Sequence, residues 1–237
     1  MSTVLASRLC APRRRAAALV LLLSVSVFGA ARPSGAVEND PLLWLTAIVG
    51  HGITDDLRAG LFLQTRFADD VSEFERLVVN PSLSWKLPRG FAVAGGYDAH
   101  VIRNPRVRLE HRSWEQLSLR HEVAGIRLFH RFRLEQRFIE GEDGAANRLR
   151  WWIEGQVPLF DTEWRGVLRN EAFFDLDAKR QGPTESGFGE TRLFAGFDRD
   201  LPGGYGLEAG YQLQYIDRRR REDLAAHTVL ITVFYPR

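Results

Sequence analysis

The sequence predicts an all-β protein, folded as a single antiparallel up-and-down transmembrane β-barrel of 10–12 strands. Three observations lead to this fold class. Charged and apolar residues alternate with a period of two along several segments. Many of these segments are longer than the strands of ordinary globular proteins. The links between them alternate between short and long, which is typical of barrels of the bacterial outer membrane.

The clearest alternation runs from Ile126 to Phe138. One set of alternate residues is mostly ionised: Arg127, Phe129, Arg131, Arg133, Glu135 and Arg137. The intervening set carries large apolar side chains: Leu128, Phe132, Leu134 and Phe138. Successive side chains of a strand point to opposite faces, whereas a helix would spread these charges around its circumference. The segment is therefore predicted to be a strand with one ionised and one apolar face.

The first 36 residues have the pattern of a secretory signal. Arginines at positions 13–15 precede the apolar or small-residue run Ala16–Phe28, and Ser34-Gly35-Ala36 fits the small-x-small cleavage rule. We expect residues 1–36 to be a cleaved signal peptide and residues 37–237 to form the barrel domain. Cleavage after Ala31 is an alternative. A transmembrane anchor is disfavoured, because a spanning helix needs about 20 apolar residues.

Composition excludes several classes of function. The formal charge of +2 comes from 32 basic and 30 acidic residues. Five of the arginines lie in the first 36 residues, where there is no acidic residue. Residues 37–237 therefore carry a net charge of about −3, whereas a nucleic-acid-binding domain is usually basic. The lone Cys10 lies in the signal, which leaves no disulfide or thiolate chemistry. The six histidines lack zinc-ligand spacing, and no phosphate-binding glycine loop is present. We expect no metal, cofactor or nucleic-acid partner.

Strand-like segments recur along the whole mature chain. There are eleven of them: Leu43–Gly50, Leu57–Phe67, Arg76–Lys86, Phe91–His100, Glu110–His121, Ile126–Phe138, Arg148–Val157, Trp164–Phe174, Glu190–Phe197, Gly206–Ile216 and His227–Tyr235. Their length suits a tilted strand that crosses a bilayer, and no apolar run is long enough for a transmembrane helix. Because outer-membrane barrels have even numbers of strands, we expect 10 or 12.

The links alternate in length. Compact links are expected at 87–90, 122–125, 158–163 and 198–205. Longer polar links are expected at 101–109, 139–147, 175–189 and 217–226. Short turns at one end and long loops at the other are typical of an up-and-down outer-membrane barrel.

Alternation alone does not decide which face is inside, since a soluble lipocalin-like barrel would enclose the apolar set. Three features favour lipid outside, the first being the closely spaced charges of both signs on the polar face. The last segment, His227–Tyr235, ends on aromatic residues, as outer-membrane proteins do for recognition by their assembly machinery, although Pro236 and Arg237 follow it. Aromatic residues, which prefer the headgroup level, also gather near segment ends: Trp44, Phe67, Trp85, Phe91, Phe138, Trp164, Phe174, Phe197, Tyr205, Tyr215, Phe234 and Tyr235.

The polar face carries charges of both signs on neighbouring segments, where they can pair across strands. We expect an ion-pair network in the lumen, formed by Glu110, Arg112, Arg127, Arg131, Arg133, Glu135, Arg137, Arg148, Arg150, Glu154, Glu171, Glu190 and Arg192.

Five short motifs, in chain order, resemble the DUF2490 family. They are Glu110-His-Arg-Ser-Trp-Glu-Gln116, Arg131-Phe-Arg-Leu-Glu-Gln-Arg-Phe138, Arg148-Leu-Arg-Trp151, Asn170-Glu-Ala-Phe-Phe174 and Glu190-Thr-Arg-Leu193. The family comprises bacterial proteins of unknown function that are interpreted as outer-membrane β-barrels. The resemblance implies the fold and the location, and it implies no activity.

Three functions stay open. The leading one is a structural or interaction barrel without enzymatic activity, filled by its Arg/Glu network. The first alternative is a small anion-preferring channel or porin, because clustered arginines favour anions. The second is an outer-membrane hydrolase, since His111, Ser113 and Glu115 share one face, an arrangement similar to that of the barrel lipid A 3-O-deacylases. The expected partners are outer-membrane lipid, the assembly machinery and small anions.

Overall fold

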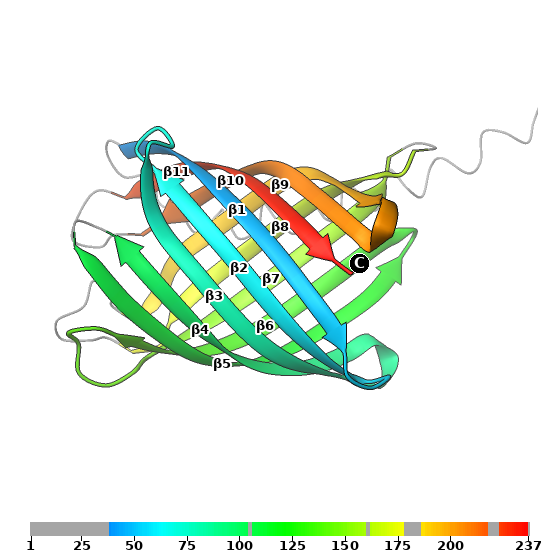
Figure 1. Ribbon diagram of the computed structural model, residues 1–237, viewed down its shortest axis with the longest axis horizontal. Coiled ribbons are helices and arrows are strands. Elements are labelled where there is room, and N and C mark those ends of the chain that lie inside the picture. The colour runs from blue at the N-terminus through cyan, green and yellow to red at the C-terminus, as the bar shows by residue number, and fades with distance from the viewer. Residues whose placement is uncertain (1–37, 104–105, 160–161, 178–185, 218–222, 237) are drawn as a thin grey trace, which may run out of the picture.

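The computed structural model describes residues 38–103, 106–159, 162–177, 186–217 and 223–236. The predicted signal peptide of residues 1–36 lies outside these residues. All described strands form one closed barrel (Figure 1). A search of the described residues finds no helix that is both long and apolar enough to cross a membrane.

Eleven strands follow one another along the described part of the chain. They are β1 (Glu38–Gly52), β2 (Leu57–Ala68), β3 (Glu73–Lys86), β4 (Phe91–Arg103), β5 (Val107–Val123), β6 (Ile126–Ile139), β7 (Ala146–Pro158), β8 (Trp164–Asp175), β9 (Gly187–Leu201), β10 (Tyr205–Ile216) and β11 (Leu224–Tyr235). Two short 3-10 turns, η1 (Pro88–Gly90) and η2 (Pro202–Gly204), join β3 to β4 and β9 to β10. Each strand pairs with the next in antiparallel fashion, which confirms the predicted all-β, up-and-down barrel.

The barrel closes in a way that the sequence did not indicate. β1 pairs with β11 in parallel, from Glu38 opposite Leu224 to Val49 opposite Tyr235 (Figure 1). The expectation of 10 or 12 strands is therefore wrong. In an up-and-down chain with an odd number of strands, the first and last strands run in the same direction, so only a parallel ladder can join them. Such a ladder satisfies the backbone donors and acceptors of both edges.

The connections differ at the two ends of the barrel. At one end, which we call the short-turn end, residues 124–125, 159–163 and 202–204 join the strands. At the opposite, long-loop end, the strands are joined by residues 140–145, 176–186 and 217–223, and by the shorter links 69–72 and 104–106. The long link expected at 101–109 is therefore wrong, because β4 and β5 extend into it. Several strands are longer than predicted, and β5 extends three residues before Glu110. The tightest turn has positive φ at Ala124 (53°) and Gly125 (79°), the conformation of a hairpin turn whose twist matches that of its strands.

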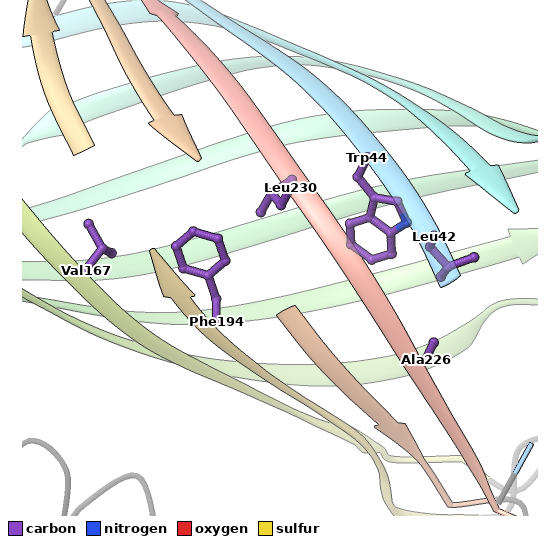
Figure 2. Close-up of a cluster of buried hydrophobic side chains, with 6 residues drawn as sticks. All are labelled: Leu42, Trp44, Val167, Phe194, Ala226 and Leu230. Atoms are coloured by element: carbon purple, nitrogen blue, oxygen red, sulfur yellow. The ribbon is translucent and has the colours of Figure 1, made fainter. Parts of the chain in front are cut away.

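The interior of the barrel is largely polar, whereas its outer face is mostly apolar. Glu135 and Asp198 are fully buried inside, whereas Leu83, Val93 and Phe132 are about half exposed on the outside. One part of the interior is apolar, a cluster of six side chains drawn in Figure 2: Leu42, Trp44, Val167, Phe194, Ala226 and Leu230. These come from β1, β8, β9 and β11, so the apolar patch lies beside the parallel seam.

Most of the aromatic residues expected near strand ends point outward, but two do not. Trp85, Phe138 and Trp164 are exposed on the outer face. Trp44 is buried in the interior cluster, and Phe234 lines the central cavity. Both were predicted to lie at the headgroup level, and this is wrong for them because they occupy the inward positions of their strands.

Cysteine cross-linking tests the parallel closure. Ala47 and Val233 are direct partners in the β1–β11 ladder, and residues 37–237 contain no native cysteine. An Ala47→Cys/Val233→Cys variant is expected to form a disulfide in most molecules on mild oxidation, because paired strand residues lie within disulfide reach. Ala47→Cys/Val229→Cys is the control, since its two positions lie four residues out of register. Equal cross-linking of both variants would contradict the register, and no cross-linking of the first would contradict the seam.

Candidate functional site: the barrel lumen

A cavity of about 1700 Å³ occupies the lumen. Its lining includes Asp69 and Asp70, in the turn between β2 and β3 at the long-loop end. It also includes Glu122 and Arg127, beside the β5–β6 turn at the short-turn end. One cavity thus has lining residues at both ends of the barrel.

Glu135 on β6 is the centre of the ion-pair network. Its Oε2 accepts hydrogen bonds from Arg148 Nη2 at 2.7 Å and from Arg112 Nη1 at 3.4 Å. Its Oε1 pairs with Arg150 Nη1, and Arg133 Nη1 lies 4.0 Å away. A fully buried carboxylate is costly unless it is paired and hydrogen-bonded, and Glu135 meets both conditions across β5, β6 and β7.

Two further carboxylates each join several arginines. Glu171 on β8 pairs with Arg131 and, at 2.6 Å, with Arg150 Nη2. Glu110 on β5 accepts from Arg112 Nε at 2.8 Å and from Arg137 Nε at 2.7 Å through the same oxygen. Arg150 bonds both Glu135 and Glu171, so these contacts join β5 through β8 into one connected network.

The remaining predicted lumen residues also point inward. Glu154 lies 3.1 Å from Arg169 Nε, and Arg192 pairs with Glu190. Arg127 also lines the cavity, but no carboxylate of the described residues lies within 4.0 Å of it.

Sequence reasoning missed part of the network. Arg169 pairs with Glu208 as well as with Glu154. Both Arg169 and Glu208 fall at alternate positions of the predicted segments Trp164–Phe174 and Gly206–Ile216. Their places in the two-residue alternation mark them as inward-facing, but their segments carry fewer charges than the β6 segment, so the pattern there is less clear.

Arginines of the lumen also stack on aromatic rings. The guanidinium carbon of Arg133 lies 3.8 Å from the ring centre of Trp114, and that of Arg131 lies 4.2 Å from the ring of Trp152. Trp114 Nε1 donates to Asp98 at 2.7 Å. Each such stacking contact contributes about 0.5–2 kcal/mol when it is desolvated. These contacts fix the guanidinium planes in the wall.

The predicted hydrolase residues lie on the outer face of β5, away from the lumen. His111, Ser113 and Glu115 share that face, but other residues occupy their polar atoms. Tyr97 Oη lies 2.7 Å from His111 Nδ1, and Ser113 Oγ donates to Gln136 Oε1 at 2.9 Å. Gln136 Nε2 donates to Glu115 at 3.1 Å. An activated serine needs a base that accepts its proton, and here Ser113 donates to an amide oxygen.

Among the described residues, no group of three or more His, Cys, Asp or Glu side chains is arranged to hold a metal ion. Glu110, Glu135 and Glu171 of the lumen are instead paired with guanidinium groups.

Residues 42–225 match the family described as "Protein of unknown function (DUF2490)". The chain belongs to this family. Among its relatives is an uncharacterized protein of Methylorubrum extorquens strain AM1, with 28% identity over 188 residues, 76% of this chain and 81% of the relative. No solved structure matches this DUF2490 protein. The match spans the strands from β1 to β11, and the resemblance of the five motifs to the family is thereby confirmed.

Proposed function

We propose that this DUF2490 protein is an outer-membrane β-barrel whose lumen conducts small anions. The observation that carries the proposal is the cavity, with its lining at both ends and its excess of arginine. The fold and the family membership are compatible with this role and assign no solute.

The outer face supports a membrane location. The side chains exposed there include large apolar residues such as Leu83, Val93 and Val229, with aromatic residues such as Trp85 and Tyr205 near the strand ends. A soluble protein rarely exposes a continuous apolar band, whereas a bilayer makes that band favourable. β11, with its aromatic end, is the segment through which the assembly machinery would recognise the chain.

The mean cross-section of the cavity is large enough for a hydrated ion. A volume of about 1700 Å³, spread over the roughly 30 Å of a bilayer core, corresponds to a mean cross-section of roughly 60 Å². The ion-pair network lies in the wall, where Glu135 is fully buried, and leaves this space in the middle. A space of this size in the middle of the barrel supports conduction over the packed ionic interior that the charge pattern suggested.

The charge of the lining favours anions. The cavity is lined by fourteen arginines and ten carboxylates. Glu135 adds one carboxylate behind the wall, which leaves a net charge of about +3. Rings of arginine or lysine select anions in pores because they lower the energy of a negative ion in the constriction.

Single-channel conductance of the purified protein in a planar bilayer tests the proposal. With a salt gradient, we expect steady conductance and a reversal potential that indicates preference for chloride over potassium. An Arg120→Gln/Arg127→Gln variant removes two positive charges from the lining and is expected to reduce that preference at least twofold. Arg199→Gln is the control, because Arg199 is on the outer face and pairs with Glu163. A folded, inserted barrel without conductance would refute the proposal.

The second candidate is a closed structural or interaction barrel. The apolar cluster of Figure 2 favours it, because Leu42, Trp44 and Leu230 line the cavity beside the seam and make that part of its wall apolar. The same recording separates the two candidates, since a closed barrel inserts without conducting.

A further inference from the structure

Three pairs of arginines face each other directly across neighbouring strands of the lumen. They are Arg66 with Arg76 on β2 and β3, Arg112 with Arg137 on β5 and β6, and Arg133 with Arg150 on β6 and β7. Like charges directly opposite each other destabilise a sheet unless something lies between them to neutralise them.

Two of the pairs have such a counter-ion within the protein. A single oxygen of Glu110 accepts from Arg112 Nε at 2.8 Å and from Arg137 Nε at 2.7 Å. One oxygen of Glu135 pairs with Arg150 and lies 4.0 Å from Arg133 Nη1, whereas the hydrogen bonds of Arg133 go to Gln116. Glu110 thus bridges its two arginines by hydrogen bonds, and Glu135 lies between the other two at ion-pair distance.

The third pair lacks this bridge. Glu75 lies 3.5 Å from Arg76, but no carboxylate of the described residues comes within 4.0 Å of Arg66. The acceptor for Arg66 Nε is the neutral side chain of Gln64, at 2.7 Å. Arg76 Nε is buried without a hydrogen-bond partner among the described residues. The guanidinium N–H donors of Arg66 and Arg76 therefore outnumber the hydrogen-bond acceptors around them.

The surroundings of the pair are apolar on one side. Trp44 is the direct partner of Arg66 in the β1–β2 ladder, and Leu230 is the partner of Trp44 across the seam. The guanidinium carbon of Arg66 lies 3.8 Å from the Trp44 ring centre. The Trp44 indole Nε1 is buried and has no hydrogen-bond partner among the described residues, in a side chain that is only 3% exposed. All four side chains line the cavity.

We propose that Arg66 and Arg76 bind the carboxylate of a small organic acid, whose apolar body lies against Trp44 and Leu230. The solute carboxylate takes the bridging place that Glu110 and Glu135 take at the other two pairs. Guanidinium forks match carboxylates in geometry and charge. Because neighbouring strands are about 4.8 Å apart, the row from Arg66 to Leu230 spans roughly 10 Å, the length of a small aromatic or short aliphatic acid.

Calorimetric titration of the purified protein in detergent micelles tests this site with benzoate as the probe. We expect benzoate to bind at least tenfold more tightly than acetate or inorganic phosphate. Arg66→Gln is expected to weaken the binding of benzoate at least tenfold. Arg127→Gln, at another lumen arginine without a carboxylate partner, is expected to leave the affinity within twofold. Absence of benzoate binding, equal affinity for acetate or phosphate, or equal effects of the two variants would overturn the inference.

A second variant supplies the missing counter-ion. Gln64→Glu is nearly isosteric and places a carboxylate where Arg66 already donates. We expect this variant to weaken the binding of benzoate at least tenfold, while its midpoint of thermal unfolding stays the same or rises. Unchanged affinity in this variant would contradict the bridging role. Binding in micelles does not depend on conduction. A barrel that binds benzoate without conducting ions refutes only the proposed function. A barrel that conducts ions without binding benzoate refutes only this site.

Discussion

A Glu135→Gln variant is expected to lose about 3–5 kcal/mol of unfolding free energy, the usual cost of removing one partner from a buried ionic contact. Glu135 is fully buried and contacts Arg112, Arg148 and Arg150 within hydrogen-bonding distance. The amide keeps the size of the side chain but leaves buried positive charges without their counter-ion. Equilibrium urea unfolding in lipid vesicles measures the loss.

The same chemical change at an exposed ion pair provides the control. Glu163 pairs with Arg199 at 2.6 Å, and the Glu163 side chain is 72% exposed. Exposed pairs contribute about 0–1 kcal/mol, so Glu163→Gln should be nearly neutral. A Glu135→Gln/Arg148→Gln double variant should recover part of the loss, because Glu135 is the only carboxylate of the described residues within 4.0 Å of Arg148. A loss below about 1 kcal/mol at Glu135 would show that the network does not hold the barrel together.

The sequence was sufficient to predict the fold class, because alternation of charged and apolar residues follows directly from the geometry of a strand. The β6 segment carried both faces so clearly that its predicted start, Ile126, is the start of the strand. Eleven segments were recognisable in the sequence, as many as there are strands in the described residues, and the even-number rule for outer-membrane barrels led to the wrong expectation of 10 or 12. The parallel closure required information of another kind. Whether β1 pairs with β11 in parallel depends on backbone hydrogen bonds, which leave no mark on the side-chain pattern.

The sequence also indicated which charges share a face, but not which charges meet. Arg66, Arg131 and Arg150 look alike in the alternation, and only the structure shows that two of them contact Glu171 whereas Arg66 has no carboxylate of the described residues within 4.0 Å. Trp44 is the clearest error, since its place near a strand end suggested the headgroup level. Alternation assigns a relative face, and the absolute face of an isolated aromatic residue depends on its register with neighbouring strands.

Replacing Gly96 by valine is expected to cost about 3 kcal/mol or more, or to prevent folding, because overpacking against fixed atoms cannot relax. Gly96 lies directly opposite Trp114 in the β4–β5 ladder. A Cβ atom at Gly96 would lie 2.3 Å from Cζ2 of Trp114 and 2.7 Å from the backbone oxygen of Pro81. Trp114 is held in place by its bond to Asp98 and by the Arg133 guanidinium above its ring, so it has little freedom to move.

The neighbouring glycine provides a matched control for that prediction. A Cβ atom at Gly95 meets only the backbone oxygen of Trp114, at an ordinary 3.6 Å. Valine also favours strands more than glycine does, so Gly95→Val is expected to be neutral or slightly stabilising. Urea unfolding in vesicles, with gel mobility as a check on folding, compares the two variants. Equal stability of both would show that Trp114 does not lie over Gly96, and the stack from Gly96 through Trp114 to Arg133 would then no longer explain how the wall of the lumen is fixed.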